Sequence, residues 1–152
     1  LLTVPLQMIE FYLILIAAGI IVSPLVFWRL LIGTLIMLLG GYAGEVGWIS
    51  AALGFVIGMF GWAYIIFEIF KGESSIAATK KDSIRKAFAA LRFIVVFGWS
   101  IYPLGYIFGL LTPMIGGDII NIDFLNITYN LADFINKILF GLIIWNVAYQ
   151  DK

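Results

Sequence analysis

The chain contains an apolar run over residues 124–147, which Lys137 interrupts near its middle. About 20 apolar residues, each rising about 1.5 Å along a helix, cross a bilayer core of about 30 Å, so the run predicts a membrane-spanning helix. A lysine near the bilayer midplane costs roughly 2.5–3.5 kcal/mol. Asp133 lies four residues earlier, on the same helix face. This pair predicts a functional site, in which chemistry neutralises the amine or the pair acts as a relay.

Five apolar spans divide the chain, at about residues 1–18, 25–44, 46–70, 87–111 and 124–149. No span alternates apolar and polar residues, so a membrane β-barrel is not expected. The chain is 63% hydrophobic and 12% charged, whereas soluble domains are about 45–50% apolar and about 25% charged. We therefore predict an all-α integral membrane helix bundle, with residues 1–152 forming a single transmembrane domain.

Charge and composition exclude several classes of function. The formal net charge is zero, so nothing indicates a nucleic acid as a partner. The chain has no cysteine and no histidine, which excludes disulfides, thiolate metal sites and histidine metal ligands. No metal site is expected.

Prolines and glycines mark positions where the helices should deviate or approach closely. Pro5 and Pro103 lie within spans, where each removes a backbone donor and should kink its helix. Gly54 and Gly58 form a small-xxx-small pattern, which is typical of close contact between membrane helices.

The linkers predict an orientation. The linker after the third span carries five basic residues, whereas the next linker carries Asp118 and Asp123 and no basic residue. These five basic residues are Lys71, Lys80, Lys81, Arg85 and Lys86. By the positive-inside rule, the basic linker and the C-terminus face the cytoplasm. Asp133 then lies about 6 Å outward of Lys137, and Glu10 lies in the cytoplasmic half.

Two further groups of residues are candidates for a site. Thr3, Gln7 and Glu10 recur at i, i+4 and i+7, which places them on one face of the first helix. The alternative is a polar seam that joins two helices. Trp99 and Tyr102 present an aromatic face beside Pro103, and core packing is the alternative there.

These residues together resemble the microbial rhodopsins, and specifically the proteorhodopsins of the blue-absorbing type. The resemblance extends over essentially the whole chain. It depends on four segments, Leu2-Thr-Val-Pro-Leu-Gln7, Trp99-Ser-Ile-Tyr-Pro103, Leu131-Ala-Asp-Phe-Ile-Asn-Lys137 and Gly141-Leu-Ile-Ile-Trp-Asn146. It implies a seven-helix fold that binds all-trans retinal, with the five spans as helices three to seven. We accordingly expect the chain to lack the first two helices and the start of the third.

The resemblance also implies roles for individual residues. Lys137 would form the Schiff base with retinal, and Asp133 would belong to its counterion. Glu10 would be the cytoplasmic proton donor, Thr3 the middle member of an Asp–Thr–Glu triplet, and Gln7 the mark of blue-absorbing forms. The retinal-binding residues would be Thr3, Gln7, Met37, Trp62, Trp99, Tyr102, Pro103, Asp133 and Lys137. The primary proton acceptor would lie four residues before Thr3, upstream of Leu1.

The function implied is a light-driven outward proton pump rather than an enzyme. The family's halide and sodium pumps carry glutamine at the donor position, so Glu10 counts against both. The alternatives are a photosensor with the same chromophore and a non-retinal transporter or channel subunit, in which Lys137 and Asp133 would form an ion-pair gate. A purely structural helix bundle is a further alternative, which two polar faces disfavour. We expect a homo-oligomer in the lipid of a prokaryotic plasma membrane, with protons as the transported ion.

Overall fold

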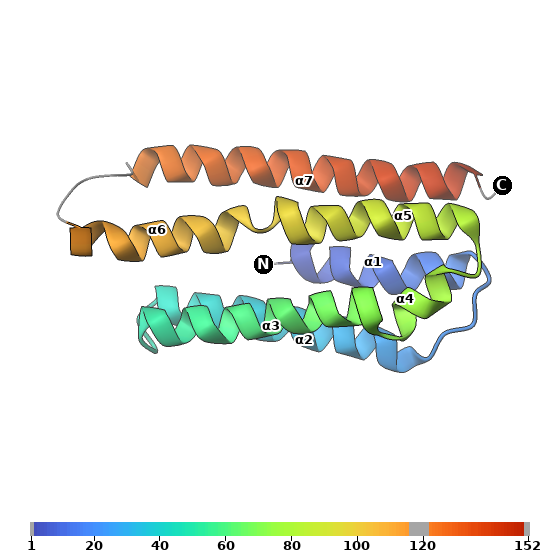
Figure 1. Cartoon of the computed structure of the whole chain (residues 1–152), viewed down its shortest axis with the longest axis horizontal. Helices are drawn as coiled ribbons and strands as arrows, with labels where there is room; N and C mark the ends of the chain where they lie inside the picture. The colour runs from blue at the N-terminus through green and yellow to red at the C-terminus, as the bar shows by residue number, and fades with distance from the viewer. Residues whose placement is uncertain (1, 116–121, 151–152) are drawn as a thin grey trace.

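The computed structural model describes residues 2–115 and 122–150, and these residues form helices joined by short connections (Figure 1). No β-strand occurs among them, which confirms the all-α prediction. The helices in chain order are α1 (Thr3–Ala17), α2 (Pro24–Glu45), α3 (Ala51–Lys71), α4 (Glu73–Ala78), α5 (Asp82–Phe93), the π-helix η1 (Ile94–Gly98), α6 (Ile101–Ile115) and α7 (Ile122–Gln150). Asp118 lies outside the described residues.

Four helical stretches are long and apolar enough to cross a membrane, namely Leu25–Glu45, Ala51–Ala78, Asp82–Gly109 and Asp123–Gln150. The fifth apolar helix, α1, is shorter. Large apolar side chains cover the outside of the bundle, as Phe60 at 67% exposure and Ile127 at 66% illustrate. Such a surface suits lipid chains rather than water, so the chain is a multi-pass membrane protein.

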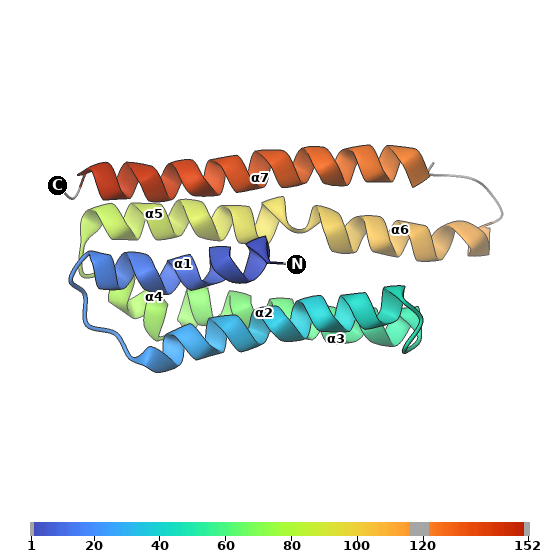
Figure 2. The same cartoon turned by 180° about the vertical axis from the view of Figure 1, so that it is seen from behind.

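The long helices run along a common axis in one bundle (Figures 1 and 2). The α2–α3 hairpin forms one side, α5, η1 and α6 in succession together with α7 form the other, and α1 lies between them. At one end lie α4, the α1–α2 connection and the end of α7. We call this the basic end, because the basic linker residues Lys71, Lys80, Lys81, Arg85 and Lys86 belong to it.

Local turn chemistry decides where the second and third spans begin. Gly19 adopts φ +73°, and Ser23 caps α2 by accepting a hydrogen bond from the Leu25 amide at 3.2 Å. Gly47 adopts φ +77°, and Ser50 accepts from the Leu53 amide at 3.3 Å. The third span therefore begins as a helix at Ala51, and its predicted start at residue 46 is wrong.

Three further expectations from the sequence need correction. The fourth span begins at Asp82 rather than residue 87, and its regular helix is interrupted by η1 and the turn at Trp99 and Ser100. The helix α4 lies in a linker for which no helix was predicted. Pro5 is the third residue of α1, where an amide has no partner within the helix, so the expected kink is not required.

Glycines bring α2 and α3 into close contact, which confirms the small-xxx-small prediction. A Cβ added at Gly54 would lie 2.7 Å from the Gly44 Cα, and one at Gly61 would lie 2.8 Å from the Gly33 carbonyl oxygen. Backbone thus meets backbone along this contact, and any larger side chain would separate the two helices.

The aromatic core near the basic end joins α1, α5 and α7. Phe11 contacts Phe88 and Phe140 edge to face, with ring centroids 5.1 and 5.9 Å apart. All three rings are almost completely buried. Such pairs contribute about 0.5–1.5 kcal/mol beyond the burial of their area, so they fix α1 against the α5–α7 side.

We expect Gly61→Ala to lower the free energy of unfolding by about 1–3 kcal/mol, because the added methyl overpacks the α2–α3 contact. Thermal unfolding in detergent micelles, followed by far-ultraviolet circular dichroism, measures the effect. Gly141→Ala is the control, since a Cβ there meets nothing within 4 Å. Alanine is the better helix former by about 1 kcal/mol, so the control should be unchanged or slightly more stable. Equal stability of the two variants would contradict the packing argument.

Candidate functional site

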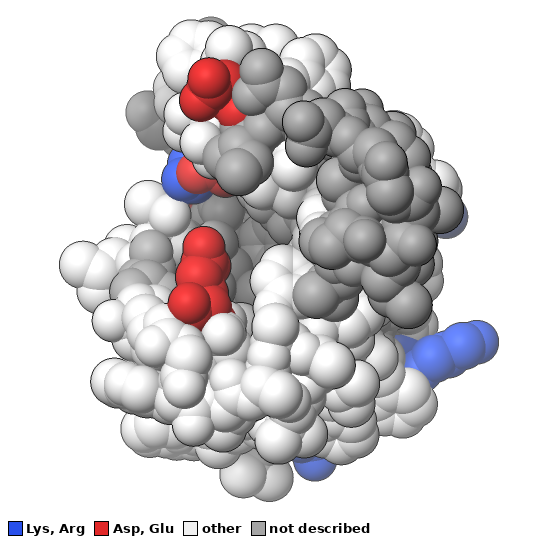
Figure 3. Space-filling model, turned by 90° about the vertical axis from the view of Figure 1, so that its left-hand side faces the viewer, with Lys and Arg blue, Asp and Glu red and all other residues white. Residues whose placement is uncertain are grey.

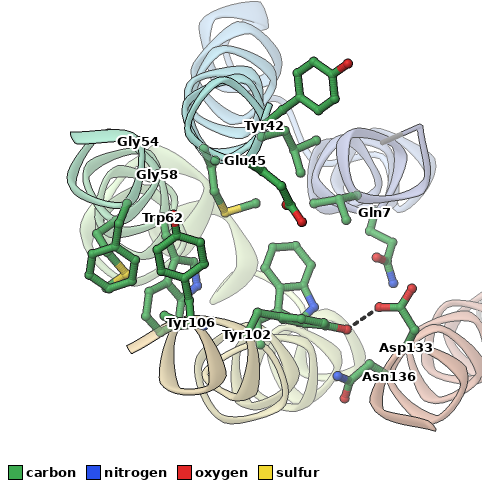
Figure 4. Close-up of a pocket in the computed structure, with 18 of the residues that line it drawn as sticks. Gln7, Tyr42, Glu45, Gly54, Gly58, Trp62, Tyr102, Tyr106, Asp133 and Asn136 are labelled. Atoms are coloured by element: carbon green, nitrogen blue, oxygen red, sulfur yellow. Dashed lines mark hydrogen bonds between the residues drawn. The ribbon is translucent and has the colours of Figure 1, made fainter. Parts of the chain in front are cut away.

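A cavity of about 500 Å³ lies between α1, α2, α3, the η1–α6 region and α7 (Figure 4). Its walls are mainly apolar and aromatic. The lining residues are Val4, Gln7, Met37, Leu38, Gly41, Tyr42, Glu45, Gly54, Phe55, Gly58, Met59, Trp62, Trp99, Tyr102, Pro103, Tyr106, Asp133, Asn136 and Lys137. This size and lining suit one long apolar ligand, since binding cavities for small molecules measure about 300–1,000 Å³.

Lys137 and Asp133 form an ion pair on the cavity wall. The Nζ of Lys137 donates a hydrogen bond to Oδ2 of Asp133. The Tyr102 hydroxyl donates to Oδ1 of the same carboxylate (Figure 4). Both carboxylate oxygens are thereby engaged. The pairing offsets part of the cost of placing each charge in an apolar setting. It confirms the predicted contact of Lys137 with Asp133 across one helical turn.

The π-helix η1 shapes the wall formed by α6. Its carbonyl groups accept hydrogen bonds from side chains of two neighbouring helices. The indole Nε1 of Trp62 donates to the Val95 carbonyl at 3.0 Å, and the Asn136 amide donates to the Gly98 carbonyl at 2.9 Å. A π turn holds an extra residue, so it rotates the following residues relative to a continuous α-helix. Trp99, which follows η1, faces the cavity.

Tyrosine hydroxyls connect the cavity wall to the end of the bundle opposite the basic end. Tyr106 stacks on Phe55 with centroids 5.4 Å apart, and its hydroxyl donates to the Ala51 carbonyl at 3.1 Å. The Tyr129 hydroxyl donates to the Tyr102 carbonyl at 3.4 Å. These contacts fix α6 against α3 and α7 on either side of the cavity.

The structure brings most of the predicted site residues together. The cavity is lined by Gln7, Met37, Trp62, Trp99, Tyr102, Pro103, Asp133 and Lys137. Thr3 lies exposed in the first turn of α1 and is not among the lining residues. Glu10 instead lines a second cavity of about 440 Å³ between α1 and α7. The proposed donor is therefore separated from the main cavity.

Several lining residues were missed in the sequence. Asn136 lies three residues after Asp133, so its position on the same helix face was available from spacing alone. Glu45 falls between the predicted spans 25–44 and 46–70, although it is the last residue of α2 and lines the cavity. Tyr106 and Phe55 come from different helices, and no sequence signal pairs them.

The arrangement is suited to binding an apolar carbonyl compound. Lys137 supplies a primary amine inside an aromatic cavity, and a primary amine condenses with an aldehyde to form an imine. Asp133 lies beside this nitrogen and can stabilise a positive charge on it. In the part of the chain that the structure describes, no group of three or more His, Cys, Asp or Glu residues could hold a metal ion.

Comparison with known sequences finds close relatives. The family model of bacteriorhodopsin-like proteins matches residues 1–150. The chain is 50% identical to the blue-light absorbing proteorhodopsin of Gamma-proteobacterium Hot 75m4 and 49% identical to the green-light absorbing proteorhodopsin of Gamma-proteobacterium EBAC31A08. Both alignments cover all of this chain, which spans 59% of the length of each relative.

Solved structures agree with these matches. A blue light-absorbing proteorhodopsin from Med12 is 48% identical with a TM-score of 0.72, over 98% of this chain and 63% of that one. The Exiguobacterium sibiricum rhodopsin is 31% identical with a TM-score of 0.77, over 96% of this chain and 66% of that one.

We expect Trp62→Phe to destabilise η1, because phenylalanine keeps an aromatic side chain but has no N–H that could donate to the Val95 carbonyl. Leaving a buried carbonyl unpaired costs about 1–3 kcal/mol. Hydrogen–deuterium exchange should therefore become faster at the amides of residues 94–100. Trp145→Phe on α7 is the control, since Trp145 is 63% exposed. Unchanged exchange in Trp62→Phe would show that the indole does not hold η1.

Proposed function

The chain belongs to the bacteriorhodopsin-like family, and we propose that it is a retinal-binding, light-driven outward proton pump of the blue-absorbing proteorhodopsin type. The observation that carries this proposal is the position of Lys137, which lines an aromatic cavity and pairs with Asp133. Membership of this family is the reason to expect retinal as the ligand. The cavity offers a site of suitable size and chemistry for it.

Lys137 holds retinal covalently through Nζ in this proposal. Retinal, when bound, supplies the absorption of visible light and a light-driven change of shape. The lining fits such a molecule, because Trp62, Trp99 and Tyr102 offer aromatic faces to a long apolar chain. The aldehyde end requires an amine, and Lys137 is the lysine that faces the cavity.

Asp133 and Tyr102 control the proton at Nζ of Lys137. The carboxylate of Asp133 favours a positive charge on this nitrogen, and the Tyr102 hydroxyl holds the carboxylate in place. A change in the direction of the N–H bond weakens this pairing, so the nitrogen holds its proton less firmly and can release it on the outward side. Tyr102 thus acts as a positioning residue for the counterion.

The distribution of charge supports outward transport. Basic residues gather at the basic end, which the positive-inside rule assigns to the cytoplasm together with the C-terminus. Asp133 precedes Lys137 in α7, which runs toward the basic end, so the carboxylate lies on the outward side of the amine. Glu10 lines the second cavity on the inward side, where an apolar setting lets a carboxyl hold a proton for resupply. The plasma membrane of a prokaryote is the proposed location.

Gln7 supports assignment to the blue-absorbing type. Overall identity does not separate the two types, since the blue- and green-light absorbing relatives are 50% and 49% identical to this chain. Gln7 is buried at 8% exposure, lines the cavity and lies on the α1 side facing Asp133 (Figure 4). Its amide dipole can favour the ground-state charge distribution of a bound chromophore and so widen the excitation gap.

We expect Lys137→Ala to abolish both the visible absorption band formed with all-trans retinal and light-driven acidification of the medium. The variant removes the amine, whereas Lys86→Ala removes an exposed lysine that pairs with Asp82 near the basic end. The protein is expressed with any sequence that precedes Leu1 in its gene, and absorption and external pH are recorded under illumination. A Lys137→Ala protein that retains the parental band would refute the attachment site. A parent that forms the band without acidifying the medium would refute the pump.

We expect Gln7→Leu to shift the absorption maximum to longer wavelength while retinal remains bound. Leucine fills a similar volume but has no amide dipole to stabilise the ground state. The visible spectrum of the purified pigment measures the shift. Leu38→Met, an apolar exchange in the same cavity, is the control for altered packing. A maximum that stays in place or moves to shorter wavelength would show that Gln7 does not set the colour.

A further inference from the structure

Arg92 is a half-buried cation near the basic end of the bundle, and the proposed function gives it no role. Its guanidinium carbon lies 5.2 Å from the ring centroid of Phe70 and 5.5 Å from that of Phe88. The guanidinium donates to the Ser75 hydroxyl at 2.8 Å, while its buried Nε has no hydrogen-bond partner among the described residues. Arginine carries five N–H donors in a planar fork, so this group can bind a further acceptor.

No ion pair joins Arg92 to a carboxylate in the part of the chain that the structure describes. The helices α3, α4 and α5 contain one acidic residue each, and other groups hold all three carboxylates. Glu68 pairs with Arg29 at 3.5 Å, and Glu73 accepts from the backbone amide of the α2 cap residue at 2.6 Å. Asp82 pairs with two exposed cations of its own helix. A half-buried charge without a partner is costly, which favours an anion from outside the chain.

The contacts of Arg92 place its guanidinium near the depth of the lipid phosphates. Phe70 is the last residue but one of α3, and Ser75 belongs to α4, which joins α3 to α5 at the basic end (Figure 1). About 20 helical residues cross the hydrocarbon core of a bilayer, and α3 has 21 residues. The last turn of α3, and the guanidinium beside it, therefore lie where the hydrocarbon core meets the headgroups.

Apolar side chains border this cation on the outside of the bundle. Phe70 is exposed, and so are Phe93, which follows Arg92 in α5, and Ile76, which follows Ser75 in α4. Exposed apolar side chains of this kind suit acyl chains. A cation bordered by apolar surface thus matches both parts of a phospholipid, the phosphate and the chains.

The two ends of the bundle differ in charge. Lys71 follows Phe70 and is exposed, and the other four basic linker residues belong to the same end. The view onto the opposite end shows acidic side chains beside a hollow (Figure 3). Basic segments at a membrane surface attract anionic lipids, so the basic end favours a lipid with a net negative charge over a zwitterionic one.

We propose that Arg92 binds the phosphate of an anionic phospholipid, whose acyl chains lie against Phe70, Ile76 and Phe93. The planar fork of a guanidinium matches two phosphate oxygens. Ser75 holds the fork in position, because its hydroxyl accepts from Arg92 and donates to the Phe70 carbonyl at 2.9 Å. The site belongs to the surface of the bundle and does not depend on the proposed proton transport.

Arg92→Gln tests the proposal in the protein expressed with any sequence that precedes Leu1 in its gene. Native mass spectrometry counts the lipids that remain bound when micelles of the protein are titrated with phosphatidylglycerol or phosphatidylcholine. We expect the parent to retain one phosphatidylglycerol per chain in preference to phosphatidylcholine. Arg92→Gln should weaken the binding of phosphatidylglycerol by about tenfold or more, because charge-assisted hydrogen bonds to phosphate are lost.

Lys86→Gln is the matched control, because it removes an exposed cation from the same helix near the same end. It should bind phosphatidylglycerol as the parent does. Unchanged binding in Arg92→Gln would overturn the proposal. An equal loss in both variants would also overturn it, since the basic end would then attract lipid without a defined site. Displacement of phosphatidylglycerol by sodium phosphate at equal concentration would show a site for free anions and would overturn the proposal too.

Chemical modification of the parent decides the question if Arg92→Gln does not fold. Phenylglyoxal reacts with arginine side chains, and mass spectrometry of peptides locates the modified residues. Phosphatidylglycerol should protect Arg92 from modification, whereas phosphatidylcholine should not. The exposed Arg85 is the internal reference and should react equally in both lipids. Equal modification of Arg92 in the two lipids would overturn the proposal.

Discussion

The ion pair of Lys137 with Asp133 is the interaction on which the cavity depends. A lysine at membrane depth is expensive, and its partner one turn away on α7 offsets part of that cost before any other helix is placed. Tyr102 then connects the pair to α6 through the second carboxylate oxygen. The register of α6 against α7 is therefore constrained by chemistry as well as by packing, and the aromatic lining is held around the amine.

The backbone of η1, which precedes α6, is subject to a second constraint that the membrane imposes. Backbone groups that leave a regular helix inside the bilayer need partners, because lipid supplies none. The carbonyls of Val95 and Gly98 in η1 obtain theirs from Trp62 and Asn136. Both donors also line the cavity, so the residues that stabilise the irregular segment are those that shape the site. The side chains of Trp62 and Asn136 therefore both stabilise the interrupted helix and form part of the cavity wall.

Two different kinds of packing hold the cavity between them. On one side, backbone contact between glycines fixes α2 against α3, which leaves little freedom for either helix to move alone. Toward the basic end, the rings of Phe11, Phe88 and Phe140 fix α1 to α5 and α7. The space between these two rigid parts is lined by residues of both.

The sequence by itself determined the membrane class, the approximate positions of the helical spans and the contact of Lys137 with Asp133. Hydrophobic length and one-turn spacing are local properties, so they need no knowledge of neighbouring helices. Gln7, Trp99 and Tyr102 could likewise be selected, by spacing and by resemblance. Tertiary structure decided the rest. The π turn, the cavity position of Glu45 and the separation of Glu10 from the main cavity depend on contacts between distant helices, such as Trp62 with Val95. Periodicity along one helix carries no information about which neighbour completes its hydrogen bonds.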